Sequence, residues 1–131
     1  MVMKESERQE IIAAAKFLED KGYKRDVDEY LITYSNGTID FLVGYERYYD
    51  EQGDILIKFR KENKSYSVEW IVVVREGVKA IQQKKESNLL FLLSYIRDNY
   101  DTLLQIDYCE ESRQLINAFI SEEVQKQRDD T

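Results

Sequence analysis

The chain has 131 residues, of which 43% are hydrophobic, 34% charged and 12% aromatic. These values are typical of one globular domain, so we expect a single domain over residues 1–131 and exclude a disordered chain. The formal net charge is −7. It makes binding to the phosphates of nucleic acid or to an anionic membrane surface unfavourable, and we expect neither partner.

The negative charge is concentrated toward the C-terminal end. Residues 98–131 contain nine acidic and three basic side chains, which gives this segment a net charge of −6. Such a segment attracts a basic protein partner through long-range electrostatics. The alternative is that the charge only keeps the protein in solution.

Cys109 is the only cysteine, which excludes an internal disulfide and is typical of a reducing compartment. The first residues are too polar for a signal peptide. No apolar run approaches the roughly 20 residues that a membrane helix needs. We therefore expect a cytoplasmic protein.

The first expected element is a helix over Glu7–Lys21. Ser6 and Gln9 have the spacing of a capping box, and Gly22 stands where a left-handed C-terminal cap is needed. One apolar stripe runs along this helix, formed by Ile11, Ala14, Ala15 and Leu18.

Two expected strands, Tyr30–Ser35 and Thr38–Tyr48, flank Asn36-Gly37, the dipeptide most typical of a two-residue type I′ hairpin turn. A turn centred on this dipeptide places the apolar side chains of both strands on one face. It predicts these cross-strand pairs: Ser35 with Thr38, Tyr34 with Ile39, Ile32 with Phe41, and Tyr30 with Val43.

Two further strands are expected at Ile55–Arg60 and Ser65–Arg75. The end of the last strand, Trp70–Val74, is apolar on both faces. That pattern is typical of a strand that lies centrally or is covered on both sides, so we expect Trp70 in the core.

Helical patterns follow the strands. Val78–Glu86 fits either a loop or a short helix, and Ser87 is placed to cap the next helix. The apolar face of that helix consists of Leu89, Leu92, Leu93, Ile96 and Tyr100. After a break near residues 105–107, a last helix is expected over Glu110–Gln127. Its stripe consists of Leu115, Ile116, Phe119, Ile120 and Val124.

Because the strands precede the later helices and do not alternate with them, the sequence predicts an α+β fold. We expect an N-terminal helix, a four-stranded antiparallel β-meander, and two or three C-terminal helices packed on the sheet.

The chain contains no histidine, which excludes serine and cysteine triads that use this base and the common zinc sites. Its five glycines do not have the spacing of a phosphate-binding loop. Asp54 precedes Glu62-Asn63-Lys64 as in metal-dependent nucleases, but Glu62 and Lys64 fall in an expected turn. The acidic neighbours of Cys109 raise a thiol pKa. We expect no enzymatic activity, no metal and no cofactor.

The residue types favour protein binding. Tyr48 and Tyr49 stand beside Asp50 and Glu51, and Asp54 follows closely. Aromatic side chains among charged ones are typical of binding hot spots, so we expect these five residues to contact a protein partner. A second expected surface contains the acids of the last third of the chain, which are Asp107, Glu110, Glu111, Glu122 and Glu123.

Residues 30–74 combine a hairpin, a Tyr-Glu-Arg-Tyr-Tyr stretch, an Ile-x-Ile-x-Phe strand and a Ser-x-Glu-Trp-Ile-Val segment. In this arrangement the chain resembles the small immunity proteins encoded beside polymorphic toxins in Gram-positive bacteria. The resemblance implies a cytoplasmic, acidic, non-enzymatic inhibitor that binds one toxin domain and blocks its active site.

Three other functions stay open at this point. The chain could be a small-ligand or regulatory module with a pocket between sheet and helices. It could be a structural or oligomerisation domain, which an exposed apolar patch would indicate. An enzyme that uses only carboxylates and tyrosines would need two carboxyl groups converging in a cleft.

Overall fold

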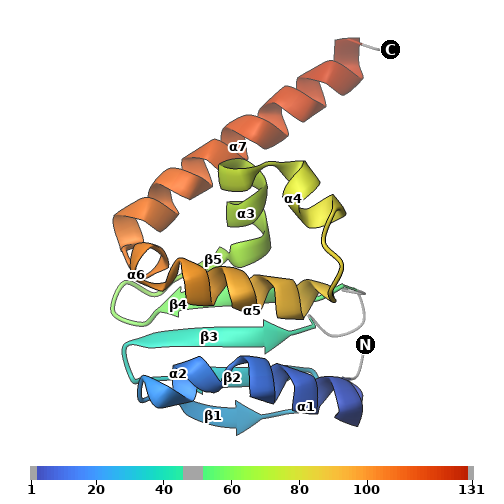
Figure 1. Ribbon diagram of the computed structural model, residues 1–131. Coiled ribbons are helices and arrows are strands. Elements are labelled where there is room, and N and C mark those ends of the chain that lie inside the picture. Colours follow the sequence, from blue (N-terminus) through green and yellow to red (C-terminus); the bar gives the residue numbers. More distant parts are fainter. Residues whose placement is uncertain (1–2, 46–51, 130–131) are drawn as a thin grey trace.

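The computed structural model describes residues 3–45 and 52–129 (Figure 1). Within these ranges the chain is an α+β fold with five antiparallel strands, which neighbour one another in sequence order. The expected class and the antiparallel meander are confirmed, with one strand more than expected. The strands are β1 (Lys24–Val27), β2 (Leu31–Ser35), β3 (Ile39–Gly44), β4 (Asp54–Phe59) and β5 (Lys64–Ser67).

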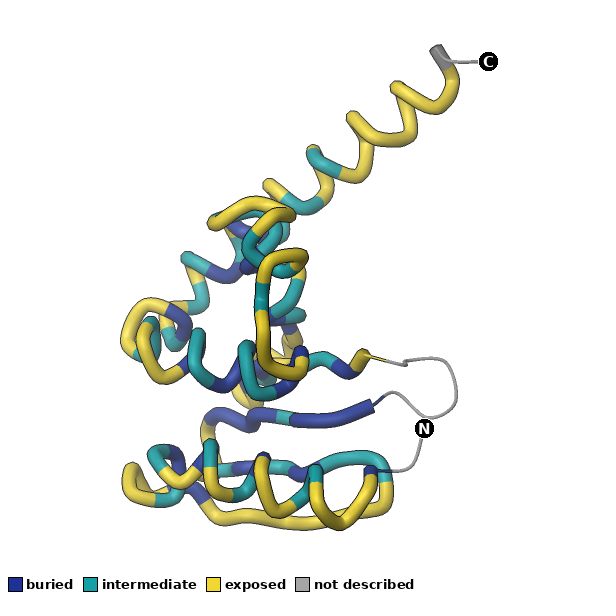
Figure 2. The backbone as a smooth tube through the Cα atoms, turned by 45° about the vertical axis from the view of Figure 1, so that its right-hand side comes forward, coloured by how far each residue is buried: buried dark blue, intermediate teal, exposed yellow. Residues whose placement is uncertain are grey.

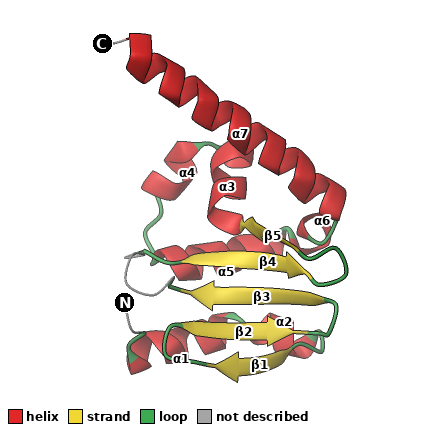
Figure 3. Cartoon of the chain, turned by 180° about the vertical axis from the view of Figure 1, so that it is seen from behind, coloured by secondary structure: helices red, strands yellow, loops and turns green. Residues whose placement is uncertain are grey.

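Helices precede and follow the sheet. They are α1 (Glu5–Ala14), α2 (Lys16–Asp20), α3 (Val68–Glu76), α4 (Val78–Gln82), α5 (Asn88–Asp98), α6 (Tyr100–Leu103) and α7 (Ile106–Asp129). Helices α1, α2 and α5 lie on one face of the sheet, whereas α3 stands beyond the β5 edge (Figures 1 and 3). The first part of α7 packs near α3, and its C-terminal part extends away from the body (Figure 2).

The core fills the space between the sheet and the helices that cover it. Alternate residues of the central strands point into this space, as the alternation of a half-buried sheet requires. The largest fully buried side chains include Tyr34, Phe41, Ile57, Leu92 and Ile96.

The expected first helix is divided in two. α1 ends at Ala14 and α2 begins at Lys16, with Ala15 between them at φ −93° and ψ 8°. Its N-terminal cap is Lys4, without a side-chain hydrogen bond, so the expected capping box at Ser6 is wrong. Gly22 has φ +96°, in agreement with its expected role after the helix.

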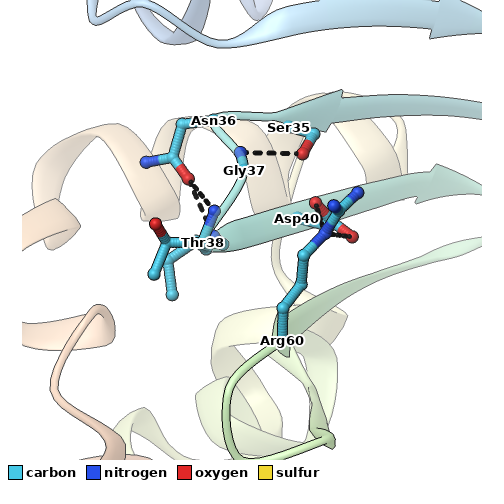
Figure 4. A network of polar contacts seen from close by, with 7 residues as sticks. Ser35, Asn36, Gly37, Thr38, Asp40 and Arg60 are labelled. Atoms are coloured by element: carbon cyan, nitrogen blue, oxygen red, sulfur yellow. Dashed lines mark hydrogen bonds and ion pairs between the residues drawn. The ribbon is translucent and has the colours of Figure 1, made fainter.

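The β2–β3 turn lies one residue later than expected (Figure 4). The Asn36 amide nitrogen donates to the carbonyl oxygen of Ile39 at 3.2 Å, so the two central residues are Gly37 and Thr38. The Asn36 side chain takes part by accepting from the amides of Thr38 at 2.9 Å and Ile39 at 2.7 Å. Gly37, with φ +91°, is therefore the first central residue, a position where glycine is favoured in a type II′ turn.

This shift makes the expected cross-strand pairs wrong by two residues. Tyr34 lies opposite Phe41, and Ile32 lies opposite Val43. Because side chains alternate with a period of two, a shift of two residues keeps each side chain on its face. The expected apolar face is confirmed, since these four residues are fully buried.

The expected fourth strand is wrong beyond Ser67, where the chain turns into α3. The Ser67 hydroxyl accepts from the Trp70 amide at 3.2 Å and so caps the helix. The apolar run then has helical spacing, with Val68, Ile71 and Val72 buried. β5 is thus a short edge strand. Trp70 was expected in the core, but its side chain is 38% exposed, so that expectation is wrong.

β1 is the strand that sequence patterning does not predict. All four of its residues are exposed, so it has no apolar alternation. Its sequence, Lys-Arg-Asp-Val, is rich in charge, as is common in edge strands that avoid pairing with other chains.

The C-terminal helices follow the prediction more closely. Ser87 caps α5, as expected, by accepting from the Leu90 amide at 3.4 Å. The ambiguous segment Val78–Glu86 contains the short helix α4. α7 begins at Ile106, four residues earlier than expected, and ends at Asp129.

Candidate functional site

Four of the expected partner-contacting residues, Tyr48, Tyr49, Asp50 and Glu51, lie outside the described residues. In the sequence they fall between Gly44, where β3 ends, and Asp54, where β4 begins. The other three, Asp54, Glu110 and Glu111, are described, and each has a partner within the chain.

Asp54 is part of the N-terminal cap of α3. Its Oδ1 accepts from the Glu69 amide at 3.1 Å, and its Oδ2 accepts from the Ser67 hydroxyl. A carboxylate at this place accepts hydrogen bonds from backbone amides that have no partner within the helix, and it interacts favourably with the helix dipole. The structure therefore gives Asp54 a role in folding at the β4–α3 junction.

Glu110 connects α7 to β5. Its Oε1 accepts from Lys64 Nζ at 2.8 Å and from the Tyr66 hydroxyl. The hydrogen bond from Lys64, followed by that from Tyr66, lowers the pKa of Glu110. Arg113 completes the cluster by lying over the Tyr66 ring, 4.4 Å from its centroid, and donating to the Ser65 carbonyl oxygen at 2.7 Å.

Glu111 pairs with Arg75 of α3 at 3.2 Å, but its side chain is still 66% exposed. Among the described acids, the structure does not bring Asp54 together with Glu110 and Glu111. Asp54 begins β4, whereas Glu110 contacts Lys64, which lies opposite Phe59 at the other end of that strand. The sequence could not show this separation, because it depends on how β5 and α7 pack.

The acids Asp107, Glu122 and Glu123 are exposed along α7. Glu123 pairs with Lys126 at 3.7 Å. The expected apolar stripe of this helix is only partly covered, because α7 extends past α3. Leu115, Ile120 and Val124 are 40%, 42% and 43% exposed, and Phe119 contacts the Trp70 ring with centroids 6.1 Å apart.

Metal or thiol chemistry finds no support in the described geometry. Residues 3–45 and 52–129 contain no group of three or more histidine, cysteine, aspartate or glutamate side chains that could hold a metal ion. Cys109 is fully buried, and burial, aided by the charge of Glu110, raises the pKa of its thiol to about 11. The expected direction of this shift is confirmed, and burial is its main cause.

One face of the sheet is not covered by any of the described helices; Figure 3 shows it toward the viewer, with α1, α2 and α5 behind the strands. We call it the open face. Leu42 and Leu56 lie side by side at its centre, and Leu56 is 37% exposed. Across the strands they continue a row that consists of Asp26, Thr33, Leu42, Leu56 and Ser67.

A second row on the open face is polar and consists of Lys24, Ser35, Asp40, Lys58 and Ser65. Arg60 Nε donates to both carboxylate oxygens of Asp40, at 3.0 and 2.9 Å (Figure 4). Burial opposes ionisation of Asp40, but hydrogen bonds from Ser35 and Arg60 prevail and lower its pKa. The open face thus combines a small apolar centre with a polar rim, the composition of a protein-binding surface.

A hollow of about 330 Å³ lies at the β2–β3 turn, lined by Gly22, Lys24, Ser35, Asn36 and Gly37. Its lining comes from turns and strand ends. It is therefore not the pocket between sheet and helices that a small-ligand module was expected to contain.

No family model matches the chain, and the comparisons with curated proteins and with solved structures found no match. Among the described helices, none combines the length and the apolar character needed to cross a membrane.

Sequence patterning missed the open face as a candidate site. Leu42 and Leu56 occupy the solvent-side positions of otherwise alternating strands. The sequence does contain a signal for this surface: two leucines stand at strand positions where the alternating pattern predicts polar side chains.

Proposed function

We propose that this chain is a non-enzymatic protein-binding module, and more specifically an immunity protein that neutralises a cognate basic toxin or effector by covering its active site. The observation that carries the binding proposal is the open face. A two-layer fold leaves this sheet surface available, and Leu42 and Leu56 give it an apolar centre beside paired charges.

The immunity function rests on two further supports. The pattern of residues 30–74 resembles that family, and the net charge of −7 favours association with a basic partner. Asp54 is the first residue of β4, and Tyr48 and Tyr49 precede it closely in the sequence. We propose that these tyrosines, with Asp50 and Glu51, extend the contact surface. A cytoplasmic location belongs to the same proposal and is supported by the single, buried thiol.

The test uses the purified product of the neighbouring gene and this chain. We expect a complex whose affinity falls as salt is raised, because charge attraction contributes to it. The substitution Leu56→Lys should weaken binding by about tenfold or more, since a charge would be buried at the centre of the contact. Titration calorimetry at two salt concentrations measures both effects.

The matched control is Val78→Lys, an equally exposed apolar position on α4 (39% against 37% for Leu56). This variant should bind as the natural chain does. Undetectable binding of the neighbouring gene product would remove the immunity proposal. Equal weakening by both substitutions would show that the open face is not the contact surface.

A further inference from the structure

The hollow at one end of the sheet is formed by the start of β1 and by the β2–β3 turn. It has a volume of about 330 Å³ and is lined by Gly22, Lys24, Ser35, Asn36 and Gly37. The strand register brings the two segments together, because Lys24 lies directly opposite Ser35. A β-carbon at either glycine would meet nothing within 4 Å. The hollow is therefore open space bounded mainly by small residues, and a small ligand can enter it from solvent.

Lys24 is the charged residue of the lining, and its ammonium group is unpaired within residues 3–45 and 52–129. The acid that precedes the hollow, Glu19, pairs instead with Arg25 at 3.1 Å. Arg25 lies opposite Tyr34, which is buried under the helices. Because side chains alternate along a strand, Lys24 points to the other side, which is the open face.

Asn36 provides a second donor, and the turn fixes its orientation (Figure 4). Its Oδ1 accepts from the amides of Thr38 at 2.9 Å and Ile39 at 2.7 Å. The other end of this side-chain amide is therefore Nδ2, which carries two hydrogens to donate. In the described part of the chain Nδ2 has no acceptor. The hollow thus has an ammonium group and an amide nitrogen that are both free to bind an anion.

The charge around these donors is positive, although the whole chain has a net charge of −7. Along the polar row of the open face, Lys24 is followed by Ser35, Asp40 and Lys58. Arg60 Nε donates to both carboxylate oxygens of Asp40, at 3.0 and 2.9 Å, and so compensates its charge. These residues contain three cations and one acid, which gives a local net charge of +2.

Two exposed acids near the hollow limit the strength of this positive field. Asp26 points to the same face as Lys24, but it lies two residues further along β1. Asp20 ends α2, two residues before Gly22. Neither acid belongs to the lining. An anion in the hollow therefore meets the free donors directly, whereas the two carboxylates act on it from outside.

From this geometry we propose that the hollow binds the phosphate group of a small molecule, between the Lys24 ammonium and the Asn36 side-chain amide. Phosphate oxygens accept strong, charge-assisted hydrogen bonds from such donors. A phosphate ester carries a charge of about −1.5 to −2 at pH 7 and so gains more from the local positive charge than a carboxylate does. This site goes beyond the proposed binding function, and it leaves Leu42 and Leu56 uncovered in the next row of the open face.

The exposure of Lys24 determines how tightly the site binds. An exposed ion pair contributes little to affinity and is screened by salt. We therefore expect a dissociation constant on the order of 1 mM for inorganic phosphate, rising as the ionic strength is raised.

The glycine amides of the full chain provide the measurement. Gly22 and Gly37 line the hollow, whereas Gly44, Gly53 and Gly77 do not and serve as internal controls. In heteronuclear NMR at pH 7, addition of sodium phosphate should shift the Gly22 and Gly37 amide signals along a saturating curve and leave the other three in place. Sodium chloride at matched ionic strength should produce no such curve, and sodium acetate should bind more weakly than phosphate.

Two substitutions test the donors. Asn36→Asp keeps the oxygen that accepts from the turn amides but replaces Nδ2 with a negative oxygen, so phosphate should bind about tenfold more weakly or worse. Lys24→Gln should raise the dissociation constant by about threefold or more. The matched controls are Gln83→Glu and Lys79→Gln, which change the net charge equally at exposed positions near α4. Both should bind phosphate as the natural chain does.

Three results would each overturn the proposal. The first is a phosphate response that does not saturate or that is shared equally by all five glycines. The second is equal binding of acetate and phosphate, which would contradict the assigned ligand class. The third is weakening of phosphate binding by the control substitutions as much as by those at Lys24 and Asn36, because net charge alone would then explain the effect.

Discussion

At the scale of single residues, Gly44 shows how closely the backbone of β3 approaches its neighbour. Its φ is +151°, and a β-carbon there would lie 2.1 Å from the Tyr30 carbonyl oxygen. That oxygen accepts a hydrogen bond from the Tyr45 amide at 3.0 Å. A side chain at position 44 would therefore break the pairing at this end of the sheet.

We expect Gly44→Ala to lower the free energy of unfolding by about 1–3 kcal/mol, through overpacking and backbone strain. Urea unfolding followed by circular dichroism measures the change. Gly22→Ala is the matched control, because Gly22 also has a positive φ, +96°, but its β-carbon would meet nothing within 4 Å. Equal losses in the two variants would contradict the explanation by crowding.

At the scale of elements, the junction of β5 and α3 is a place where the local strand preference of the residues and the observed helix disagree. The run Trp70–Val74 contains three β-branched valines and an isoleucine, which favour strands. It forms a helix nevertheless, because Ser67 and Asp54 cap its first turn and its buried residues have helical spacing. Asp54 lies 13 residues before Ser67, so no local window of sequence contains this cap.

Asp54→Ala should destabilise the chain by about 1–2 kcal/mol, because the amides at the start of α3 lose a charged acceptor. Asp54→Asn keeps one acceptor oxygen and should lose less. Thermal unfolding gives the size of the effect, and fluorescence of Trp70, the only tryptophan, reports on α3 itself. If Asp54→Ala unfolded like the natural chain, the capping role would be wrong.

At the scale of the whole molecule, the Glu110 cluster determines where α7 is attached. The hydrogen bonds from Lys64 and Tyr66 join the last helix to the edge strand across 44 to 46 residues of sequence. They lower the pKa of Glu110. A carboxyl whose pKa is lowered by folding stabilises the folded state above its unfolded pKa, and this contribution is lost as the pH falls through the folded pKa.

We therefore expect Glu110→Gln to unfold more easily than the natural chain at pH 7, with a smaller difference at an acid pH below the lowered folded pKa of Glu110, where both side chains are neutral. Urea titrations at both pH values measure it. Glu122→Gln, an exposed acid on the same helix, should show little change at either pH. A difference between Glu110→Gln and the natural chain that stays constant with pH would contradict the assignment.

The sequence by itself determined the fold class, the apolar face of β2 and β3, and the helix that follows Ser87. These features depend on local periodicity and on capping, both of which act over a few residues. The candidate site was predicted only in part. The acids Asp54, Glu110 and Glu111 were identified by charge, but charge alone does not tell a partner-facing carboxylate from one bonded within the chain.

Only the tertiary structure decided which surfaces of the sheet and of the helices are exposed. Leu42 and Leu56 form one apolar centre because β3 and β4 pair in that register and none of the helices in residues 3–45 and 52–129 covers their outer side. One side of α7 is exposed because α3 and β5 occupy the other side of the helix. Which face of a strand or helix is covered depends on contacts between residues far apart in the chain, and periodicity within one element cannot specify them.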